Sequence, residues 1–340
     1  MPKIRWGILS TGFIANLFAE GLTALDDAAL TAVGSREQAS ADAFGEKWKV
    51  PHRHGSYEAL ANDPDVEVIY VGTPHPFHYE NTLMCLNAGK HVLVEKPFAM
   101  NARQAREMID LARKKGLFLM EAMWTRYLPA MVQLRKWIAD GEIGDVELVR
   151  AHFSFMADFN PQSRLFAPEL GGGALLDAGI YPISFAHMVL GTPKTVNSTA
   201  SLGKTGTDDR SSYMFGYDGG KTALLSSGVR LAVPVEAHVF GTKGYIKVHE
   251  PWLNPRVVTL AKASAPGSDS MLIYDGILFD QQTVRPPSLG NGYNYEAAEV
   301  GQCIRAGKRE SQIMSLAETL AIMETLDKIR AQWNLTYPNE

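Results

Sequence analysis

Short apolar runs alternate with helix-like patterns through roughly the first third of the chain. Each run has the length of a buried strand, and they lie at Ile4–Leu9, Leu30–Gly34, Val66–Val71, His91–Val94 and Leu117–Met120. Strands that are apolar on both faces are typical of a parallel sheet covered by helices. The alternation therefore predicts an α/β protein that begins with a doubly wound parallel sheet.

One helix between these strands carries signals at both of its ends. Asn101 is a good N-cap residue, and Gln104 stands at the capping-box position. Gly116 can end the helix in the left-handed conformation. The apolar positions between these ends follow a helical spacing, at Ala105, Met108, Ile109 and Ala112. The pattern predicts an amphipathic helix.

The pattern changes after residue 121. Helices are expected over residues 128–139, 174–190 and 311–333, and a strand over 146–155. From residue 195 to 248 strands follow one another, with turns at Asp218-Gly219-Gly220 and Thr242-Lys243-Gly244. This half is predicted to form a second α/β domain with a largely antiparallel sheet. We divide the chain into residues 1–123 and 124–340, and expect the closing helix to pack back on the first domain.

Size and composition agree with two soluble domains. The 340 residues exceed the ~250–300 at which single cores stop growing. The formal charge is -4 and no basic run is present, so we expect no nucleic-acid partner. Neither a signal-peptide core nor an apolar stretch of ~18 residues is present, so we expect a cytoplasmic protein without a membrane partner. We interpret Cys85 and Cys303 as buried free thiols, and we predict no metal site.

The first strand leads into a turn that is typical of dinucleotide binding. The fingerprint G-x-G-x-x-G/A is matched by Ser10-Thr11-Gly12-Phe13-Ile14-Ala15. Gly12 allows the backbone to approach a pyrophosphate, and the following helix offers free N–H groups to the phosphates. Ser10 replaces the first glycine of the pattern, so a merely tight strand–helix turn is the alternative.

The end of the second strand bears on the choice of cofactor. An NAD site usually has an acidic residue there for the ribose hydroxyls, whereas this chain has Ser35 and Arg36. Both side chains can bind the 2′-phosphate of NADP. Glu37 follows, and we expect it to point away along the helix. NADP is the predicted cofactor and NAD the alternative; a solvated Arg36 without a ligand is the competing interpretation.

The third and fourth strands end in residues suited to the cofactor and to chemistry. The loop Thr73-Pro74-His75-Pro76-Phe77-His78 would lie along the cofactor, with His75 or His78 in contact; for His78 a structural role is the competing interpretation. The next strand ends in Glu95-Lys96-Pro97, where a nicotinamide ring would arrive. A charged Lys96 there can orient substrate hydroxyls.

A second candidate segment runs from Gly171 to Tyr181. Its three glycines would permit close approach to a ligand, and Asp177 and Tyr181 share a helix face at i, i+4 spacing. A nearby ammonium lowers the pKa of a phenol, so Lys96 could help Tyr181 to accept a proton. A buried core tyrosine is the alternative.

Three segments resemble the Gfo/Idh/MocA (glucose–fructose oxidoreductase / inositol dehydrogenase / rhizopine catabolism) family across nearly the full chain. They are WGILSTGFIA at residues 6–15, Glu95-Lys96-Pro97, and GGGALLDAGIY at residues 171–181. The last is similar to that family's D-x-G-x-H pattern, with Tyr181 in place of histidine. Tyrosine there, with the segment at residues 121–129, resembles a subgroup, the dimeric dihydrodiol dehydrogenases and NADP-dependent D-xylose 1-dehydrogenases.

The resemblance implies an N-terminal Rossmann domain and a C-terminal domain whose open antiparallel sheet makes a homodimer or homotetramer. It implies that Lys96 is catalytic, that Tyr181 is the acid/base, and that the peptide before Pro97 is cis. Trp124 and Arg126 would wall the substrate pocket at the domain junction, with core packing the alternative for Trp124. Weaker pocket candidates precede the glycine run, at Arg164 and Phe166.

The leading hypothesis is an NADP-dependent dehydrogenase of a sugar or cyclic diol. It would oxidise an aldopyranose such as D-xylose at C1, or a trans-dihydrodiol. The alternatives are a non-catalytic dinucleotide sensor and a redox-neutral glycosidase or eliminating enzyme with a retained cofactor, because fold alone does not fix function. Retention of Lys96, Asp177 and Tyr181 argues against the sensor.

Overall fold

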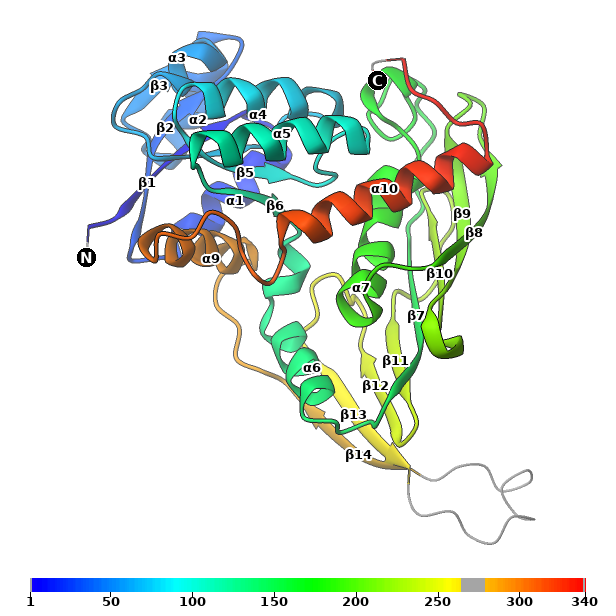
Figure 1. Cartoon of the computed structure of the whole chain (residues 1–340). Helices are drawn as coiled ribbons and strands as arrows, with labels where there is room; N and C mark the ends of the chain where they lie inside the picture. Colours follow the sequence, from blue (N-terminus) through cyan, green and yellow to red (C-terminus); the bar gives the residue numbers. More distant parts are fainter. Residues whose placement is uncertain (1, 264–278, 339) are drawn as a thin grey trace, which may run out of the picture.

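The computed structural model describes residues 2–263, 279–338 and 340, and these form two sheets (Figure 1). The first sheet has six parallel strands in the order β3-β2-β1-β4-β5-β6. Its strands are β1 (Ile4–Leu9), β2 (Ala28–Gly34), β3 (His52–His54), β4 (Val68–Val71), β5 (His91–Glu95) and β6 (Leu119–Ala122). Its helices are α1 (Phe13–Leu22), α2 (Gln38–Trp48), α3 (Tyr57–Ala61), α4 (His78–Asn87) and α5 (Ala102–Lys115), with the short turn η1 (His75–Phe77).

The second sheet has eight strands among the described residues, in the order β14-β13-β12-β11-β7-β10-β9-β8. They are β7 (Val146–Ser154), β8 (Thr195–Leu202), β9 (Asp208–Gly216), β10 (Thr222–Gly228), β11 (Ala237–Gly241), β12 (Gly244–Val248), β13 (Val258–Ala263) and β14 (Phe279–Val284). Every pair is antiparallel except β7 with β10. The predicted fold class is thus confirmed.

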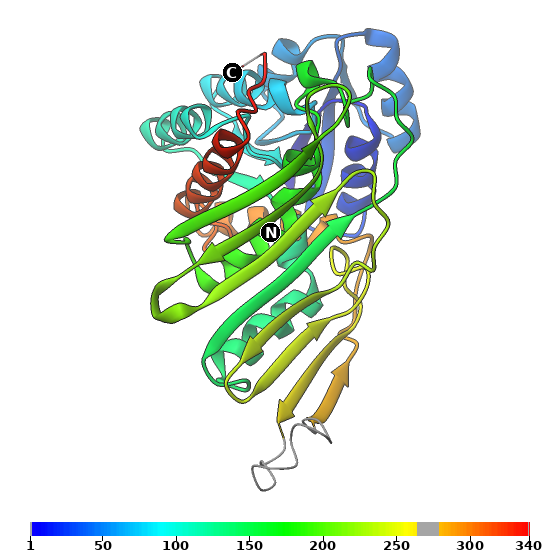
Figure 2. The same ribbon diagram turned by 90° about the vertical axis from the view of Figure 1, so that its right-hand side faces the viewer.

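Helices cover one face of this second sheet, and the other face carries no described helix (Figure 2). The helical segments of this half are η2 (Trp124–Tyr127), α6 (Pro129–Ala139), η3 (Pro168–Leu170), η4 (Leu175–Gly179), α7 (Ile180–Leu190), η5 (Asp218–Gly220), α9 (Tyr293–Arg305) and α10 (Leu316–Gln332). The stretch Pro168–Leu190 has the length and composition of a membrane span, but 83% of its most apolar window is buried. Such burial is typical of a core helix.

Local sequence signals predicted the ends of helix α5 correctly. The Asn101 side chain accepts a hydrogen bond from the Gln104 N–H, and Gly116 ends α5 at φ 65°. The predicted closing helix begins later than expected, at Leu316, because Ser315 is its cap and accepts from Glu318 N–H. Sequence patterns did not indicate β3, since its three residues are all polar and lie at an edge.

Helix α10 crosses from one sheet to the other (Figure 1). On one side Arg106 pairs with Glu324 at 2.8 Å, and Asp327 accepts from Ala102 N–H at 2.8 Å. On the other side Gln332 bonds the Ser198 hydroxyl of β8 at 2.7 Å. The last helix therefore joins the two halves of the molecule.

Arg126 makes a second junction. Its guanidinium donates to the Ser184 carbonyl at 2.7 Å and to the Ile313 carbonyl at 3.1 Å, and it pairs with Glu318 at 2.8 Å. The side chain is 3% exposed. One cation thus holds η2 against α7 and against the start of α10.

We predict that Arg126→Ala strongly destabilises the protein. It leaves buried carbonyls without a donor, and losing one partner of a buried charged network costs about 3–5 kcal/mol. The melting temperature should fall by roughly 5–10 °C in calorimetry. The control is Arg103→Ala, because its pair with Glu107 is exposed to solvent and such pairs contribute little to stability. Equal shifts for both variants would contradict the role given to Arg126.

Candidate active site

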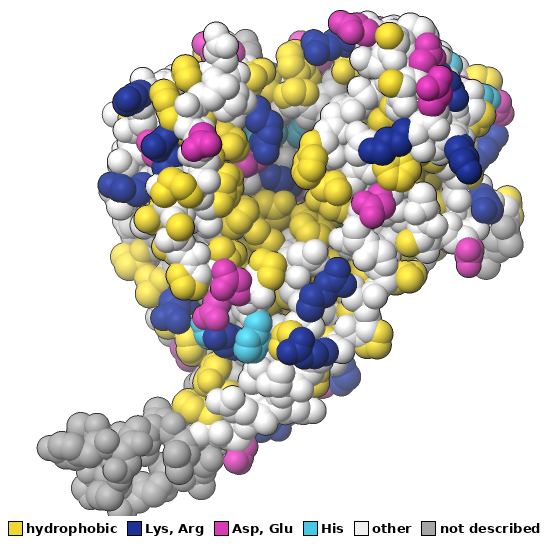
Figure 3. Space-filling view, turned by 180° about the vertical axis from the view of Figure 1, so that it is seen from behind, with side chains coloured by type: hydrophobic (Ala, Val, Ile, Leu, Met, Phe, Trp, Pro, Cys, Tyr) yellow, Lys and Arg dark blue, Asp and Glu magenta, His cyan; other side chains and the backbone are white. Residues whose placement is uncertain are grey.

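A cavity of about 710 Å³ opens at the carboxyl edge of the parallel sheet. Figure 3 shows the molecule hollowed between its two lobes, with hydrophobic and basic side chains in the hollow. The lining includes every residue predicted to bind the cofactor: Ser10, Thr11, Gly12, Phe13, Ile14, Ser35, Arg36, Thr73, Pro74, His75, His78, Glu95 and Lys96. The carboxyl edge of a doubly wound sheet is where ligands of this fold class bind.

The turn after β1 fits a pyrophosphate. Helix α1 begins without a side-chain cap, so its first N–H groups are available to an anion. A Cβ on Gly12 would meet only the Ser10 hydroxyl, at 3.5 Å, so space is open beside the backbone. Ser10 stands at φ 131°, a conformation that favours glycine, and its hydroxyl accepts from the Gly12 N–H at 3.2 Å. Ser10 thus adopts the backbone conformation that the first glycine of the fingerprint would favour.

The end of β2 presents polar groups to the far end of the cavity. Arg36 is exposed and lies beside Tyr57; burial raises the pKa of Tyr57, and Arg36 opposes that rise. Tyr57 was not predicted, although it also lines the cavity. Glu37, expected to point away, borders the cavity too, because it lies at the N-cap of α2, where the chain is still extended. An acidic group therefore accompanies Ser35 and Arg36.

The two histidines of the third loop have different surroundings. His78 is fully buried, and its ring nitrogens lie 2.7 Å from the Pro97 carbonyl and 2.8 Å from the Thr73 carbonyl. Burial lowers the pKa of His78 to about 4 although both carbonyls favour the protonated ring, and the contacts tie the loop to the end of β5. His75 is buried with no hydrogen-bond partner for Nδ1, and burial lowers its pKa well below the usual range. The structural interpretation fits His78, and His75 has a nitrogen free for a ligand.

At the inner end of the cavity, Lys96 meets Asp177 and Tyr181. The Lys96 ammonium donates to the Asp177 carbonyl at 2.9 Å and lies 3.4 Å from its carboxylate. Its Nζ also lies 4.9 Å from the centre of the Tyr181 ring. Arg164 binds the same carboxylate oxygen of Asp177 at 2.7 Å. The structure thus brings together four of the predicted site residues from distant parts of the sequence.

The surroundings of Asp177, Lys96 and Tyr181 shift their pKa values in different directions. Burial raises the pKa of Asp177, but Lys96 and Arg164 outweigh burial and hold that pKa well below its usual range. Burial opposes the charge of Lys96, while Tyr181 and Asp177 more than compensate and raise its pKa. Burial raises the pKa of Tyr181, and the opposing effect of Lys96 is too small to reverse that rise. Without a ligand the phenol is therefore neutral, contrary to a simple expectation of a lowered pKa.

Glu95 lies directly behind Lys96. It is buried, accepts from the Tyr70 hydroxyl at 2.5 Å, and accepts from the Lys96 N–H at 3.1 Å. Burial raises its pKa. The peptide between Lys96 and Pro97 is cis, as the resemblance implied.

Three residues expected in the substrate pocket, Trp124, Arg126 and Phe166, do not line the cavity. Trp124 is buried and stacks on Tyr293 at 4.7 Å, but its indole N–H donates to the Tyr181 hydroxyl at 3.1 Å. It therefore orients the tyrosine from behind. Arg126 does not line this cavity either, because the three-way junction described above holds its guanidinium. Phe166 belongs to a small separate core and is fully buried.

The glycine run also has a different role from the one expected. A Cβ on Gly172 would come within 2.8 Å of the backbone of Phe166, so this glycine is required by chain packing, not by a ligand. The helix that follows starts with the π-helical turn η4, which contains Asp177. Such wide turns are frequent at functional sites. Both Asp177 and Tyr181 line the cavity as predicted.

The sequence analysis did not predict that two phenylalanines line one side of the cavity. Phe153 and Phe155 line the cavity, and Phe153 meets the Tyr181 ring edge-on at 5.6 Å. They are two positions apart at the end of β7, so they share a face of the sheet. The predicted strand at residues 146–155 contained this signal, but nothing in the sequence indicated which face would meet the first domain.

A dinucleotide turn at one end of a cavity and ionisable groups at the other suit hydride transfer, so fold and site define the class of nicotinamide-dependent oxidoreductases. Within that class the chain belongs to the Gfo/Idh/MocA family. The family model described as an oxidoreductase family with an NAD-binding Rossmann fold matches residues 4–123. The Gfo/Idh/MocA C-terminal domain model matches residues 131–247. The resemblance stated from the sequence is confirmed.

Curated relatives match over nearly the whole chain. The trans-1,2-dihydrobenzene-1,2-diol dehydrogenase of Xenopus laevis is 40% identical, covering 98% of this chain and 99% of the relative. The enzyme of that name from Mus musculus is 37% identical, covering 99% of both chains.

Two solved structures show the same architecture. KijD10, a 3-ketoreductase from Actinomadura kijaniata in complex with NADP and TDP-benzene, has a TM-score of 0.81 and 26% identity, with 97% of each chain covered. An aldose–aldose oxidoreductase from Caulobacter crescentus complexed with glycerol has a TM-score of 0.84 and 23% identity, also with 97% of each chain covered. The second comparison supports the fold alone.

We predict that Gly12→Ala leaves the fold intact and weakens dinucleotide binding. The structure has room for the added methyl group, but the methyl would occupy the space that a pyrophosphate needs. Titration calorimetry with NADP should show at least about a tenfold loss of affinity, or ~1.4 kcal/mol. The melting temperature of the unliganded variant should equal that of the parent. Unchanged affinity in a folded variant would show that the pyrophosphate does not approach Gly12.

Proposed function

We propose that the protein is an NADP-dependent dehydrogenase that oxidises a CH–OH group of a sugar ring or a cyclic diol. The observation that carries the proposal is the placement of the Lys96 ammonium between Asp177 and the Tyr181 ring, at the inner end of a cavity that begins at a dinucleotide turn. The names of the curated relatives support a cyclic diol, and the family supports a hydride-transfer reaction. Residues 1–123 would bind the cofactor, and residues 124–340 would complete the substrate site.

Each side chain has a part in this proposal. When bound, NADP would supply the positively charged ring that accepts the hydride. In its phenolate form Tyr181 would accept the proton of the substrate hydroxyl, and the Trp124 N–H fixes the direction of the tyrosine oxygen. Lys96 favours the phenolate, which burial disfavours. A drop of about three pKa units takes roughly 4 kcal/mol, so a dry closed site is needed for Lys96 to supply a large part of it.

The two sides of the cavity suit a ring with one apolar face and a hydroxylated edge. Phe153 and Phe155 provide the apolar side. Arg164 and Asp177 provide a charged side that can bind neighbouring hydroxyls. A sugar ring has an apolar C–H face and a hydroxylated edge. In a dihydrodiol of an aromatic ring the apolar part and the two hydroxyl groups are separated more completely.

We further propose that the protein assembles as a homodimer or homotetramer through the open face of the second sheet. Met214 and Leu224 are opposite each other on β9 and β10, and they are 50% and 44% exposed. Exposed apolar side chains grouped on one sheet face mark an interaction surface. The buried free thiols Cys85 and Cys303 support a reducing compartment such as the cytoplasm.

The experiment that tests the function follows NADP reduction by absorbance with pentoses, hexoses, inositols and dihydrodiols. We expect turnover with at least one of these classes. Tyr181→Phe should lower kcat by about 10²–10⁴-fold with little change in the affinity for NADP, because it removes the hydroxyl that transfers the proton and accepts from the Trp124 N–H but keeps the ring. Tyr79→Phe is the control, since its hydroxyl bonds Glu107 and the residue does not line the cavity.

Two outcomes would contradict the proposal. If no compound in the panel leads to reduction of NADP although the protein binds NADP, the non-catalytic dinucleotide sensor is favoured. Cofactor that copurifies at full occupancy and is never turned over would favour the redox-neutral enzyme.

We predict that Arg36→Ala changes the preference between cofactors. A charge-assisted hydrogen bond to the 2′-phosphate is worth about 1.5–3 kcal/mol, so kcat/KM for NADP should fall by roughly 10–100-fold. The value for NAD should stay the same or rise slightly, because NAD lacks that phosphate. Arg103→Ala should change neither. Equal losses for NADP and NAD would show that Arg36 does not read the 2′-phosphate.

A further inference from the structure

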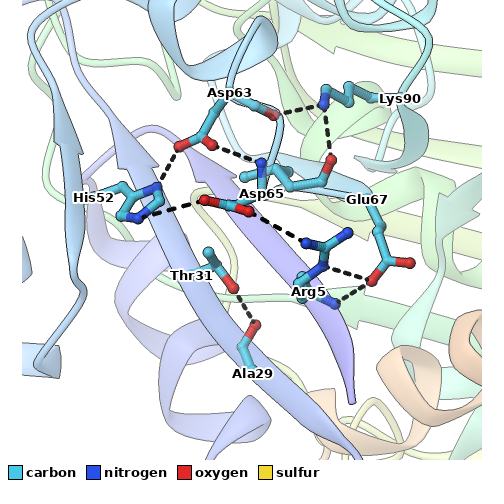
Figure 4. A network of polar contacts seen from close by, with 9 residues as sticks. Arg5, Ala29, Thr31, His52, Asp63, Asp65, Glu67 and Lys90 are labelled. Atoms are coloured by element: carbon cyan, nitrogen blue, oxygen red, sulfur yellow. Dashed lines mark hydrogen bonds and ion pairs between the residues drawn. The ribbon is translucent and has the colours of Figure 1, made fainter. Parts of the chain in front are cut away.

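A cluster of ionisable residues lies at the open edge of the parallel sheet, on the side of β3 (Figure 4). His52 and His54 are two positions apart on β3, so their side chains leave the strand on the same face. Asp63 comes from the loop between α3 and β4 and points at both rings. The proposed catalytic chemistry uses none of these residues.

Three potential ligand atoms converge in this cluster. Asp63 Oδ2 lies 2.7 Å from His52 Nδ1 and 2.9 Å from His54 Nε2. All three atoms lie within 4.8 Å of one another. Two imidazole nitrogens and one carboxylate oxygen form a common set of protein ligands for a catalytic-type zinc site, in which water takes the fourth position.

The groups around the three ligand atoms also favour metal binding. The other nitrogen of His52, Nε2, lies 3.9 Å from Asp65 Oδ2. A metal-binding histidine almost always gives its second N–H to a carboxylate or carbonyl. Asp63 Oδ1 accepts from the Asp65 N–H at 2.9 Å, which leaves Oδ2 to face the rings.

A buried lysine holds the loop that presents Asp63. Lys90 donates to the Asp63 carbonyl at 2.6 Å and to the Val66 carbonyl at 2.8 Å (Figure 4). Arg5 lies 3.4 Å from Asp65 and binds Glu67 at 3.2 Å, so it balances the charge of the outer carboxylates. The loop therefore has a fixed backbone, and the carboxylates of Asp63, Asp65 and Glu67 exceed the two cations, Lys90 and Arg5, by one charge.

The cluster is also accessible from one side. The Asp63 side chain is 3% exposed, whereas those of His52 and His54 are 36% and 24% exposed. Protein lies behind the carboxylate, and solvent reaches the rings. A metal ion can enter from that side and keep a water ligand there.

We propose that His52 Nδ1, His54 Nε2 and Asp63 Oδ2 bind a divalent transition metal, zinc by preference. Mixed nitrogen and oxygen ligands suit zinc, whereas calcium and magnesium require mainly oxygen. With bonds of about 2.0–2.1 Å, ligand atoms in a tetrahedral set lie roughly 3.3–3.4 Å apart. The rings therefore have to move outward by about 0.5 Å from their present hydrogen bonds. This assignment replaces the expectation, drawn from the sequence, that the chain has no metal site.

The site is connected to the cofactor end of the cavity. The His54 carbonyl accepts from the Ser35 N–H at 3.0 Å, and His54 pairs with Gly34 across the two strands. A metal ion that fixes His54 would therefore also fix the strand end that presents Ser35 and Arg36. This link rests on the proposed NADP site, whereas the metal site itself does not.

The test is a zinc titration of the full chain after removal of metals with a chelator. Calorimetry with Zn²⁺ should show one site per chain. With free zinc at 100 times Kd, the free energy of unfolding should rise by about 2.7 kcal/mol, seen as a higher melting temperature. Co²⁺ should give the visible spectrum of a four-coordinate ion. These readouts do not depend on dehydrogenase activity, so they separate this proposal from the proposed function.

The variants His52→Gln and His54→Gln should each weaken zinc binding at least tenfold. Their melting temperatures without metal should stay close to that of the parent, because glutamine can keep a hydrogen bond to Asp63. His249→Gln is the control; that histidine bonds Thr259 on the second sheet. Zinc binding that both variants retain would place the ion elsewhere and overturn the assignment. A parent protein that binds no zinc, or a six-coordinate cobalt spectrum, would overturn it as well.

Discussion

The active site depends on one constraint: the Asp177 carboxylate is buried and has to stay charged. A buried anion is tolerated only with well-placed cations, and removing a partner from such a group costs several kcal/mol. Here the cations come from separate places, Lys96 from the end of β5 and Arg164 from the segment before the glycine run. The carboxylate is therefore satisfied only when the parallel sheet and the second half of the chain are docked, and that docking also forms the cavity.

The same packing gives neighbouring groups opposite protonation states. Asp177 stays ionised between two cations, whereas the Tyr181 phenol stays protonated because burial acts on it more strongly than Lys96 does. Pairs of titratable groups with divergent surroundings are how one site assigns acid and base roles. The support for Tyr181 comes from far away in the chain, since Trp124 bonds its hydroxyl and is itself stacked on Tyr293 of α9. The closing third of the sequence, through Tyr293, thus helps to position the Tyr181 hydroxyl, which it does not contain.

Much of the cofactor end was predictable because it depends on local signals and on topology. The loops after β1, β2, β4 and β5 all lie at one edge of the parallel sheet. A sequence pattern that identifies these loops therefore also identifies the residues that line the cofactor end of the cavity. The substrate end depends on how the second sheet faces the first, which no local pattern encodes. Phe153 and Phe155 were missed for this reason, and Arg126 was misplaced because a charged residue at a junction can face either a ligand or buried carbonyls. The cluster of His52, His54 and Asp63 was missed because an edge strand of three polar residues gives no periodic signal.

The charge balance of the cavity has a consequence for the chemistry it favours. Lys96 and Arg164 contribute two positive charges beside the Asp177 carboxylate, and the Glu95 carboxyl, whose pKa burial raises, lines the same cavity. In the proposed reaction negative charge develops on the oxygen of a substrate hydroxyl as it loses its proton, and the buried ammonium of Lys96 is a fixed cation that can stabilise this charge. In the reverse of the proposed reaction the same ammonium would polarise a carbonyl oxygen. The proposed chemistry is therefore favoured in both directions, and the ratio of oxidised to reduced cofactor would decide which of them proceeds.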